Sequence, residues 1–427
     1  MSLRPKGENS AFFAIYCMLA AFATYFCMYA FRKPFAVGMY EGLEIWGIDY
    51  KIVLIISQVL GYTLSKFIGI KVVSEATRKR RIFLILAFIG VAEIALVLFG
   101  LIPPPYNFIC LFFNGLPLGM IWGLVFSFLE GRRFTELLGA GLCASFILAS
   151  GVVKSVGKFL IEQFAVSEFW MPAATGLVFV PPLLLSVWLL SKIPPPTAED
   201  EQLRTQRVPM DARQRLAFFR QFALGIVLLV AVYAALNAYR DFRDNFSVEI
   251  WTALGYGGAP AIFTLSELPI ALITLIAAGS MILIKDNRQA FWISQASVFL
   301  GAALIALTTF GYEAGVVDPA LWMISVGLGM YIPYIAYHVM IFERLIAMFR
   351  VKSNIGYLVY LADAFGYLAS VLVMLYRDFG AGTTSWLDFF IWISYAMAAG
   401  CVILMGLSLF YFRQKEKEHG VVGLEMA

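Results

Sequence analysis

The sequence predicts an all-α, polytopic membrane protein with twelve transmembrane helices in two pseudo-symmetric six-helix bundles. The first reason is composition, since 61% of the 427 residues are hydrophobic and only 14% are charged. A soluble domain is about 45–50% apolar and about 25% charged, so this chain has too few charges for a surface that faces water. The second reason is the length of the apolar runs, about twenty residues, which fits helices that cross a lipid core better than the shorter, alternating strands of a barrel. The third reason is an internal repeat.

Twelve apolar segments follow one another along the chain, separated mostly by short polar turns. They cover residues 11–38, 50–72, 82–101, 107–129, 136–162, 169–191, 217–248, 259–284, 290–312, 319–342, 354–376 and 386–412. The one long polar stretch, 192–216, starts with a Pro-rich run and is densely charged, so it is too polar for lipid. We therefore expect an N-terminal bundle over 1–191, a linker over 192–216, and a C-terminal bundle over 217–427 that ends in a short tail. The first apolar run is too long for a cleavable signal peptide.

The Lys and Arg residues in the connecting loops set the expected orientation. Twenty-two of them lie at the two termini, in the linker and in the loops on that same side, whereas the opposite loops hold only Lys51 and Arg377. Cytoplasmic loops carry an excess of these residues. We therefore expect a multi-pass protein of the cell membrane with both termini and the linker in the cytoplasm.

The two halves of the chain contain similar residues at an almost constant separation in sequence. Tyr25 aligns with Tyr233, and Arg32 aligns with Arg240, each pair 208 residues apart. Membrane proteins built from two such repeats hold a solute near the midplane, between the halves. The repeat therefore predicts a central site to which both halves contribute.

Several charged residues fall inside the predicted helices, where a charge costs about 2.5–3.5 kcal/mol on insertion scales. Such residues persist when they pair or line a polar cavity. The cations are Arg32, Lys33, Lys66, Lys71, Lys154, Lys158, Arg240 and Arg243. The candidates for coupling to protons are Glu93, Glu267, His338 and Asp363. Lys33 is expected to extend to the outer headgroups instead of a cavity.

The first and seventh predicted helices each carry a polar stripe on an apolar surface, at i, i+4, i+7 spacing. Each stripe contains an arginine, whose planar guanidinium suits phosphate or carboxylate and stays charged. The stripe on the seventh helix continues past Arg240 to Asp244, at i+11. We expect Arg32, Lys66 and Arg240 to line one central cavity. The candidate solute-binding residues are Tyr25, Tyr29, Arg32, Lys66, Lys154, Tyr233, Asn237 and Arg240.

Some of these cations also have a structural interpretation. Arg240 could pair with Asp244, one helical turn away on the same face. Lys154 could form a stabilising bridge with Glu93 or Asp363. In either case the charge would be held by the protein itself.

Two segments resemble a known family. YFCMYAFRKPFAV (25–37) resembles the first-helix motif of the organophosphate:phosphate antiporters, a branch of the major facilitator superfamily, and GYTLSKFIG (61–69) resembles their second helix. The resemblance implies that Arg32 and, through the repeat, Arg240 hold a substrate phosphate, and that Lys66 helps to bind the anion. YRDFRDNF (239–246) departs from that family, because it places two acids beside its two arginines.

The expected function is secondary active transport of a small organic anion by alternating access, with a phosphate ester favoured. Exchange for phosphate and proton coupling both remain open. The alternatives are a carrier of a non-phosphorylated solute and a non-transporting sensor or scaffold built on a carrier fold. An enzyme is not expected, because no GxSxG, HExxH or Walker A motif occurs, and no catalytic residue is assigned.

The expected partners are a small anionic solute and the lipid bilayer, with no nucleic acid. A monomer is expected, because one chain already contains both halves. The sequence implies no cofactor and no metal site. The five cysteines lie in apolar runs and form no CxxC motif.

Overall fold

The computed structural model describes residues 10–129, 135–195, 212–349, 355–382 and 384–425. Twelve helices within these ranges are long and apolar enough to cross a membrane. They coincide with the twelve predicted segments one for one, so the predicted all-helical, twelve-span class is confirmed. Most of the expected linker lies outside the described residues.

The described residues form two compact units. The first contains those within 1–204, 244–275 and 375–383, and the second contains those within 205–243, 276–374 and 384–427. Three helices contribute to both units: α9 (Ala212–Asn245), α11 (Ile262–Ile282) and α15 (Ile355–Gly380). The predicted division into bundles over 1–191 and 217–427 stays a prediction.

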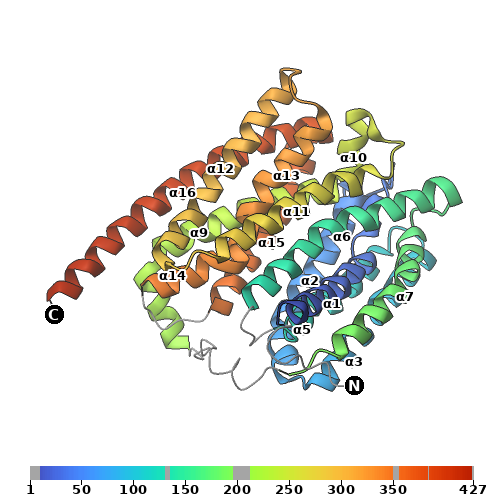
Figure 1. Ribbon diagram of the computed structural model, residues 1–427. Coiled ribbons are helices and arrows are strands. Elements are labelled where there is room, and N and C mark those ends of the chain that lie inside the picture. The colour runs from blue at the N-terminus through green and yellow to red at the C-terminus, as the bar shows by residue number, and fades with distance from the viewer. Residues whose placement is uncertain (1–9, 130–134, 196–211, 350–354, 383, 426–427) are drawn as a thin grey trace. The chain divides into compact units, whose positions relative to one another are not determined.

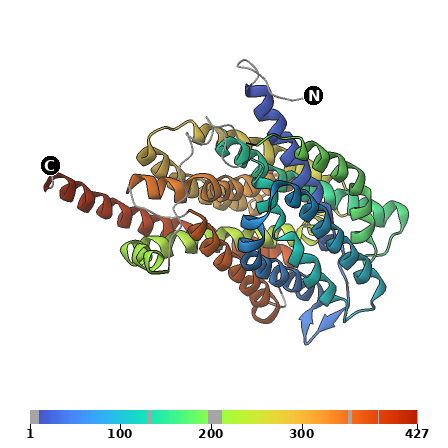
Figure 2. The ribbon, with the colours of Figure 1, turned by 90° about the horizontal axis from the view of Figure 1, so that it is seen from below.

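The first unit is built around α1 (Ser10–Met28), which packs against α6 (Thr135–Phe164) and α7 (Met171–Ser191), and around α4 (Phe108–Leu118), which packs against α2 (Tyr50–Glu75) and α3 (Arg78–Leu101). Its shorter helical elements are η1 (Tyr29–Phe31), η2 (Pro34–Val37), α5 (Ile121–Phe126), α10 (Ser247–Trp251) and η3 (Thr252–Tyr256). An antiparallel hairpin of β1 (Glu44–Ile45) and β2 (Ile48–Asp49) precedes α2 and was not predicted; Figure 2 shows it as blue arrows.

The first helix ends at Met28, earlier than the predicted residue 38. Pro34 has no N–H, and its ring collides with a preceding helical turn, so a regular helix cannot pass through it. Side-chain amides satisfy the carbonyl groups that this break releases. Asn114 Nδ2 donates to Phe31 O at 2.9 Å, and Gln58 Nε2 donates to Arg32 O at 2.9 Å. The stretch after Met28, which contains the 3₁₀ helices η1 and η2, therefore has a fixed place in the first unit.

In the second unit, α12 (Asn287–Glu313) packs against α13 (Pro319–Ala336) and α16 (Trp386–Glu425). This unit also contains η4 (Tyr337–Ile341) and α14 (Phe342–Met348). The turn η4 is π-helical and continues α13 into α14. The last helix, α16, runs unbroken for 40 residues toward the C-terminus (Figure 1).

Glycines allow close helix contacts in both units. A Cβ atom at Gly115 of α4 would overlap the backbone carbonyl of Gln58 on α2. A Cβ atom at Gly329 of α13 would likewise overlap the carbonyl of Gly301 on α12. Small residues at such positions let membrane helices approach closely, since lipid supplies little hydrophobic drive for their association.

The five cysteines are all buried free thiols: Cys17, Cys27, Cys110, Cys143 and Cys401.

Candidate functional site

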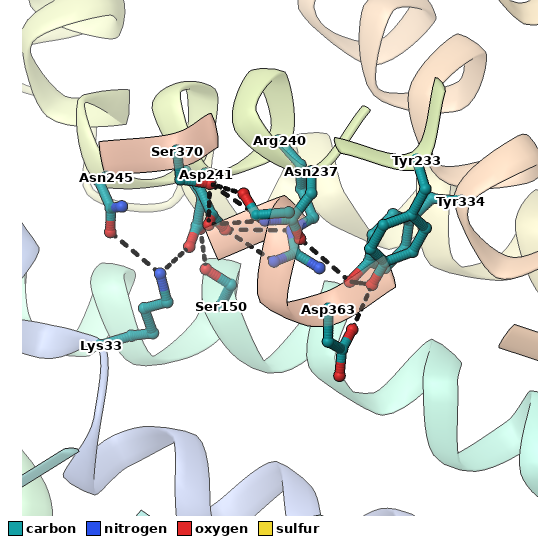
Figure 3. Close-up of polar contacts among 12 residues, drawn as sticks. Lys33, Ser150, Tyr233, Asn237, Arg240, Asp241, Asn245, Tyr334, Asp363 and Ser370 are labelled. Atoms are coloured by element: carbon teal, nitrogen blue, oxygen red, sulfur yellow. Dashed lines mark hydrogen bonds and ion pairs between the residues drawn. The ribbon is translucent and has the colours of Figure 1, made fainter. Parts of the chain in front are cut away.

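In the first unit, the Asp244 carboxylate at the end of α9 joins two lysines. Lys154 Nζ on α6 lies 2.5 Å from Asp244 Oδ1. Lys33 Nζ pairs with Asp244 Oδ2 and donates to Asn245 Oδ1 at 3.0 Å, and Ser150 Oγ also donates to Asp244 (Figure 3). The exposed fractions are 6% for Lys33, 3% for Lys154 and 9% for Asp244. We call these five residues the Asp244 cluster; two ammonium groups share one carboxylate in it, which gives a formal charge of +1 when all three are ionised.

A second group of cations in the first unit surrounds the Tyr62 ring of α2. Arg32 Cζ lies 3.9 Å from the ring centroid, and Lys66 Nζ lies 5.1 Å from it. Arg32 also lies 5.8 Å from the Tyr29 ring, which packs edge-on against Tyr25. Cation–π contacts stabilise charges that are held away from water. Tyr62 was not among the predicted site residues, although its position one turn before Lys66 was an available signal.

Lys51 and Glu249 form a buried ion pair, also in the first unit, with exposed fractions of 1% and 7%. Burial raises the pKa of Glu249, and the charge of Lys51 offsets part of this effect. Arg377 Nη1 lies 4.0 Å from Asp378 Oδ1. Both Lys51 and Arg377 were expected in loops, but Lys51 lies in the first turn of α2 and Arg377 in the last turn of α15.

In the second unit, Arg240 is held by its neighbour Asp241. Arg240 Nη2 and Nε lie 2.7 and 3.2 Å from Asp241 Oδ1. Asp241 Oδ2 accepts hydrogen bonds from Ser370 Oγ at 2.8 Å and from Asn237 Nδ2 at 3.3 Å (Figure 3). Arg240 Cζ also lies 4.4 Å from the centroid of the Tyr334 ring. The guanidinium is therefore held by the Asp241 carboxylate along one edge and by the face of the Tyr334 ring.

A second polar group of this unit is centred on the Tyr233 hydroxyl. Tyr233 Oη donates to Asp363 Oδ1 at 2.6 Å and lies 3.2 Å from Tyr334 Oη and 3.4 Å from His338 Nε2. The Tyr233 and Tyr334 rings are stacked, with centroids 5.4 Å apart. The structure thus brings Tyr233 of the predicted solute-binding set together with two of the predicted coupling residues, His338 and Asp363.

Three expected pairings differ from those in the structure. Lys33 was expected to reach the headgroups, but it is buried against Asp244, because the chain leaves the helical path after Met28. Lys154 pairs with Asp244, and not with Glu93 or Asp363. Arg240 pairs with Asp241, and not with Asp244. The long side chain of Lys154 reaches an acid far away in sequence, which helical periodicity alone could not identify.

The other two predicted coupling residues, Glu93 and Glu267, pack beside glycines of neighbouring helices. The Glu93 carboxylate of α3 packs beside Gly176 of α7, where a Cβ atom would overlap Glu93 Oε2. Among the described residues, neither of its oxygens has a hydrogen-bond partner. The Glu267 side chain on α11 packs beside Gly151 of α6.

The solved structures that match this chain include three transporters with the major facilitator fold. A D-xylose–proton symporter matches with a TM-score of 0.57 at 12% identity, over 92% of this chain and 96% of its own. A bacterial homologue of the human lysosomal transporter Spinster, inward-facing and unoccupied, matches with 0.60 at 13% identity, over 96% and 99%. A mutant of the nucleoside transporter NupG matches with 0.59 at 15% identity, over 94% and 100%. At these identities the likeness shows the fold alone.

The protein is therefore a twelve-span membrane protein with the major facilitator fold. It belongs to a family described as a family of unknown function (DUF5690), whose profile matches residues 34–415. No protein of curated function matches its sequence.

Proposed function

We propose that the protein is a secondary active transporter that moves a small organic anion by alternating access. The observation that carries the proposal is the positive charge buried within a transporter fold. Lys33 and Lys154 share the single carboxylate of Asp244, and Arg32 and Lys66 lie around one tyrosine ring. Ionisable residues inside membrane helices mark solute or ion pathways, because their burial is costly without such a role.

Phosphate esters are the proposed solutes. Guanidinium groups bind phosphate oxygens through two parallel hydrogen bonds, so Arg32 and Arg240 are the proposed contacts, with Lys66 as an added point charge. Asp241 occupies Nε and Nη2 of Arg240, which leaves the Nη1 edge as the proposed contact with the solute. The resemblance of 25–37 and 61–69 to the organophosphate:phosphate antiporters supports the same class. Tyr25, Tyr29, Lys154, Tyr233 and Asn237 complete the proposed set.

A binding screen tests the solute class. Purified protein is heated with inorganic phosphate, glycerol 3-phosphate, glucose 6-phosphate, xylose or uridine, since a ligand that binds only the folded state raises the melting temperature further as its concentration rises above its dissociation constant. We expect phosphate esters to stabilise the protein in a concentration-dependent manner. Stabilisation by xylose or uridine alone would point to the alternative, a carrier of a non-phosphorylated solute.

Counterflow in proteoliposomes tests transport itself and the role of the arginines. Arg32→Lys should lose exchange almost as completely as Arg32→Ala, because an ammonium cannot replace the planar fork of a guanidinium. Arg240→Lys should behave likewise, whereas Lys66→Arg should keep more activity than either. Full exchange by Arg32→Ala at normal expression would contradict the proposed site. Binding without exchange in the native chain would identify a sensor built on a carrier fold.

A further inference from the structure

His338 occupies an unusual backbone position. It lies in the π-helical turn η4, between α13 and α14 of the second unit. Single π-turns within α-helices occur frequently at functional sites, because the wider turn changes the direction of side chains and weakens the regular hydrogen-bond ladder. His338 is also one of only two histidines in the chain, and the other, His419, belongs to the C-terminal end of α16.

The partners of the His338 ring constrain its hydrogens. Nδ1 lies 3.1 Å from the backbone oxygen of Tyr334, which can only accept, so Nδ1 carries a hydrogen. Nε2 faces Tyr233 Oη at 3.4 Å. The same hydroxyl lies 2.6 Å from Asp363 Oδ1. One hydroxyl group therefore stands between an imidazole nitrogen and a carboxylate oxygen.

This arrangement satisfies the hydrogen-bonding groups in two ways. In the first, Asp363 is ionised and accepts from Tyr233, while Tyr233 Oη accepts from the Nε2–H of a charged His338. In the second, a protonated Asp363 donates to Tyr233 Oη, and Tyr233 donates to Nε2 of a neutral His338. The first becomes the second when the Nε2–H bond breaks and an O–H bond forms on Tyr233, while the original Tyr233 O–H bond breaks and one forms on Asp363 Oδ1. One proton crosses the hydroxyl, and no other reactant is needed.

Charges of both signs surround this group. The Arg240 guanidinium over the Tyr334 ring disfavours a charged imidazole, whereas the Asp363 carboxylate favours one. The titratable and charged groups that face the relay from α9, α13, η4 and α15 are Tyr233, Arg240, Asp241, Tyr334, Tyr337, Asp363 and Tyr367. Because Arg240 is also a proposed solute contact, a bound anion would change the field at the histidine.

We propose that His338, Tyr233 and Asp363 form a proton-binding relay, through which solute movement is coupled to proton movement. The coupling role rests on the proposed transport function, whereas proton sharing within the relay does not. The proposal assigns proton coupling to His338 and Asp363 and gives Tyr233 the role of carrying the proton between them.

Histidine titration tests the relay without any solute. Full-length protein labelled with ¹⁵N-histidine is reconstituted in lipid, and the ring signals are followed by NMR between about pH 5 and pH 8. The variant His419→Gln assigns the remaining signal to His338. In Asp363→Asn the titration midpoint of His338 should move to lower pH by about 1 unit, because an opposite charge near the imidazole is lost. Tyr233→Phe should also move it.

The matched controls are Asp286→Asn, at the exposed N-cap of α12, and Tyr376→Phe, at an exposed position of α15. Neither should change the His338 signal. A His338 midpoint that is the same in Asp363→Asn as in the native chain would overturn the relay.

Coupling is tested in proteoliposomes that contain a pH-sensitive dye, with the same five solutes as probes. In the native chain, net uptake of the solute that shows counterflow should be accompanied by a change of internal pH. His338→Gln should lose this proton movement but retain counterflow, which needs no net proton transfer. Loss of neither, or loss of both in a variant that folds normally, would reject the coupling role. Absence of counterflow in the native chain would reject the proposed transport function, while the titration would still decide the relay.

Discussion

Asp244 is the residue on which the buried charges of the first unit converge. Its two carboxylate oxygens face different lysines, one that follows the first helix and one from α6. Each lysine is nine-tenths buried or more, so it depends on this carboxylate for compensation in a medium of low polarity. The aspartate therefore ties together three segments that are far apart in the sequence.

Asp244→Asn should lower the melting temperature of the purified protein, because it leaves two buried ammonium groups without the carboxylate they share. Removing one partner of a buried ion pair costs about 3–5 kcal/mol. Thermal unfolding followed by tryptophan fluorescence measures the effect. Asp286→Asn is the control, since asparagine caps a helix about as well as aspartate. Equal melting temperatures for Asp244→Asn and the native chain would show that the lysines are stabilised in another way.

Glu249 makes the stability of the first unit depend on pH. Its pKa is raised above the ordinary value of 4.5, mainly by burial and despite the charge of Lys51. An acid whose pKa is raised in the folded state contributes stability at pH values below its pKa in the unfolded state. This stability is lost as the pH rises through its pKa in the folded state. The melting temperature of the native chain minus that of Glu249→Gln should therefore be greater at about pH 4 than at about pH 8. A difference that is constant or that grows with pH would be contrary to this expectation; Glu41→Gln, an exposed change in the loop after η2, is the control.

At the residue scale, the sequence identified the polar stripes but not the partners. Periodicity places Tyr233 and Asn237 on the face of Arg240, and the structure has all three in one unit, near Tyr334. Periodicity could not identify Tyr334 as a neighbour of these residues, because contacts between distant helices depend on tertiary packing. The presence of Arg32, Lys66 and Arg240 in one cavity stays a prediction.

At the scale of helices, the glycine contacts set how closely neighbours can pack. Gly115→Ala should lower the melting temperature, because the added methyl group would overlap the Gln58 carbonyl and push α4 away from α2. Gly90→Ala on α3 is a matched control, since nothing lies within 4 Å of its Cβ position. Alanine there should be neutral or stabilising by up to about 1 kcal/mol, through its better helix propensity. If both variants melted at the same temperature, the close approach of α2 and α4 would have no energetic weight.

The existence of the elements was easier to predict than their irregularities. A run of about twenty apolar residues defines a spanning helix almost regardless of context, and all twelve were identified. Departures from regular helix have weaker local signals. Pro34 was a usable sign that the first helix ends early, but the π-helical turn at Tyr337–Ile341 has no proline or glycine inside it to mark it.

For the whole molecule, the orientation in the membrane follows from loop charge and is directly testable. Single cysteines at Lys285 and Glu418 should be labelled from the cytoplasmic side, and cysteines at Glu41 and Val316 from the other side, because the excess of Lys and Arg stays in the cytoplasm. Membrane-impermeant maleimide applied to intact cells, then to opened membranes, distinguishes the two. Labelling of Glu418→Cys from outside the cell would contradict the predicted orientation.

The burial of the native thiols makes such measurements simple. The five cysteines are between 0 and 6% exposed, so a water-soluble maleimide has little access to them. An introduced cysteine would then be the main reporter even when every native cysteine is retained. Fluorophores or spin labels could follow the movement of individual helices when a solute is added to an otherwise unaltered chain, without a cysteine-free version whose core packing would have to be rebuilt at five places.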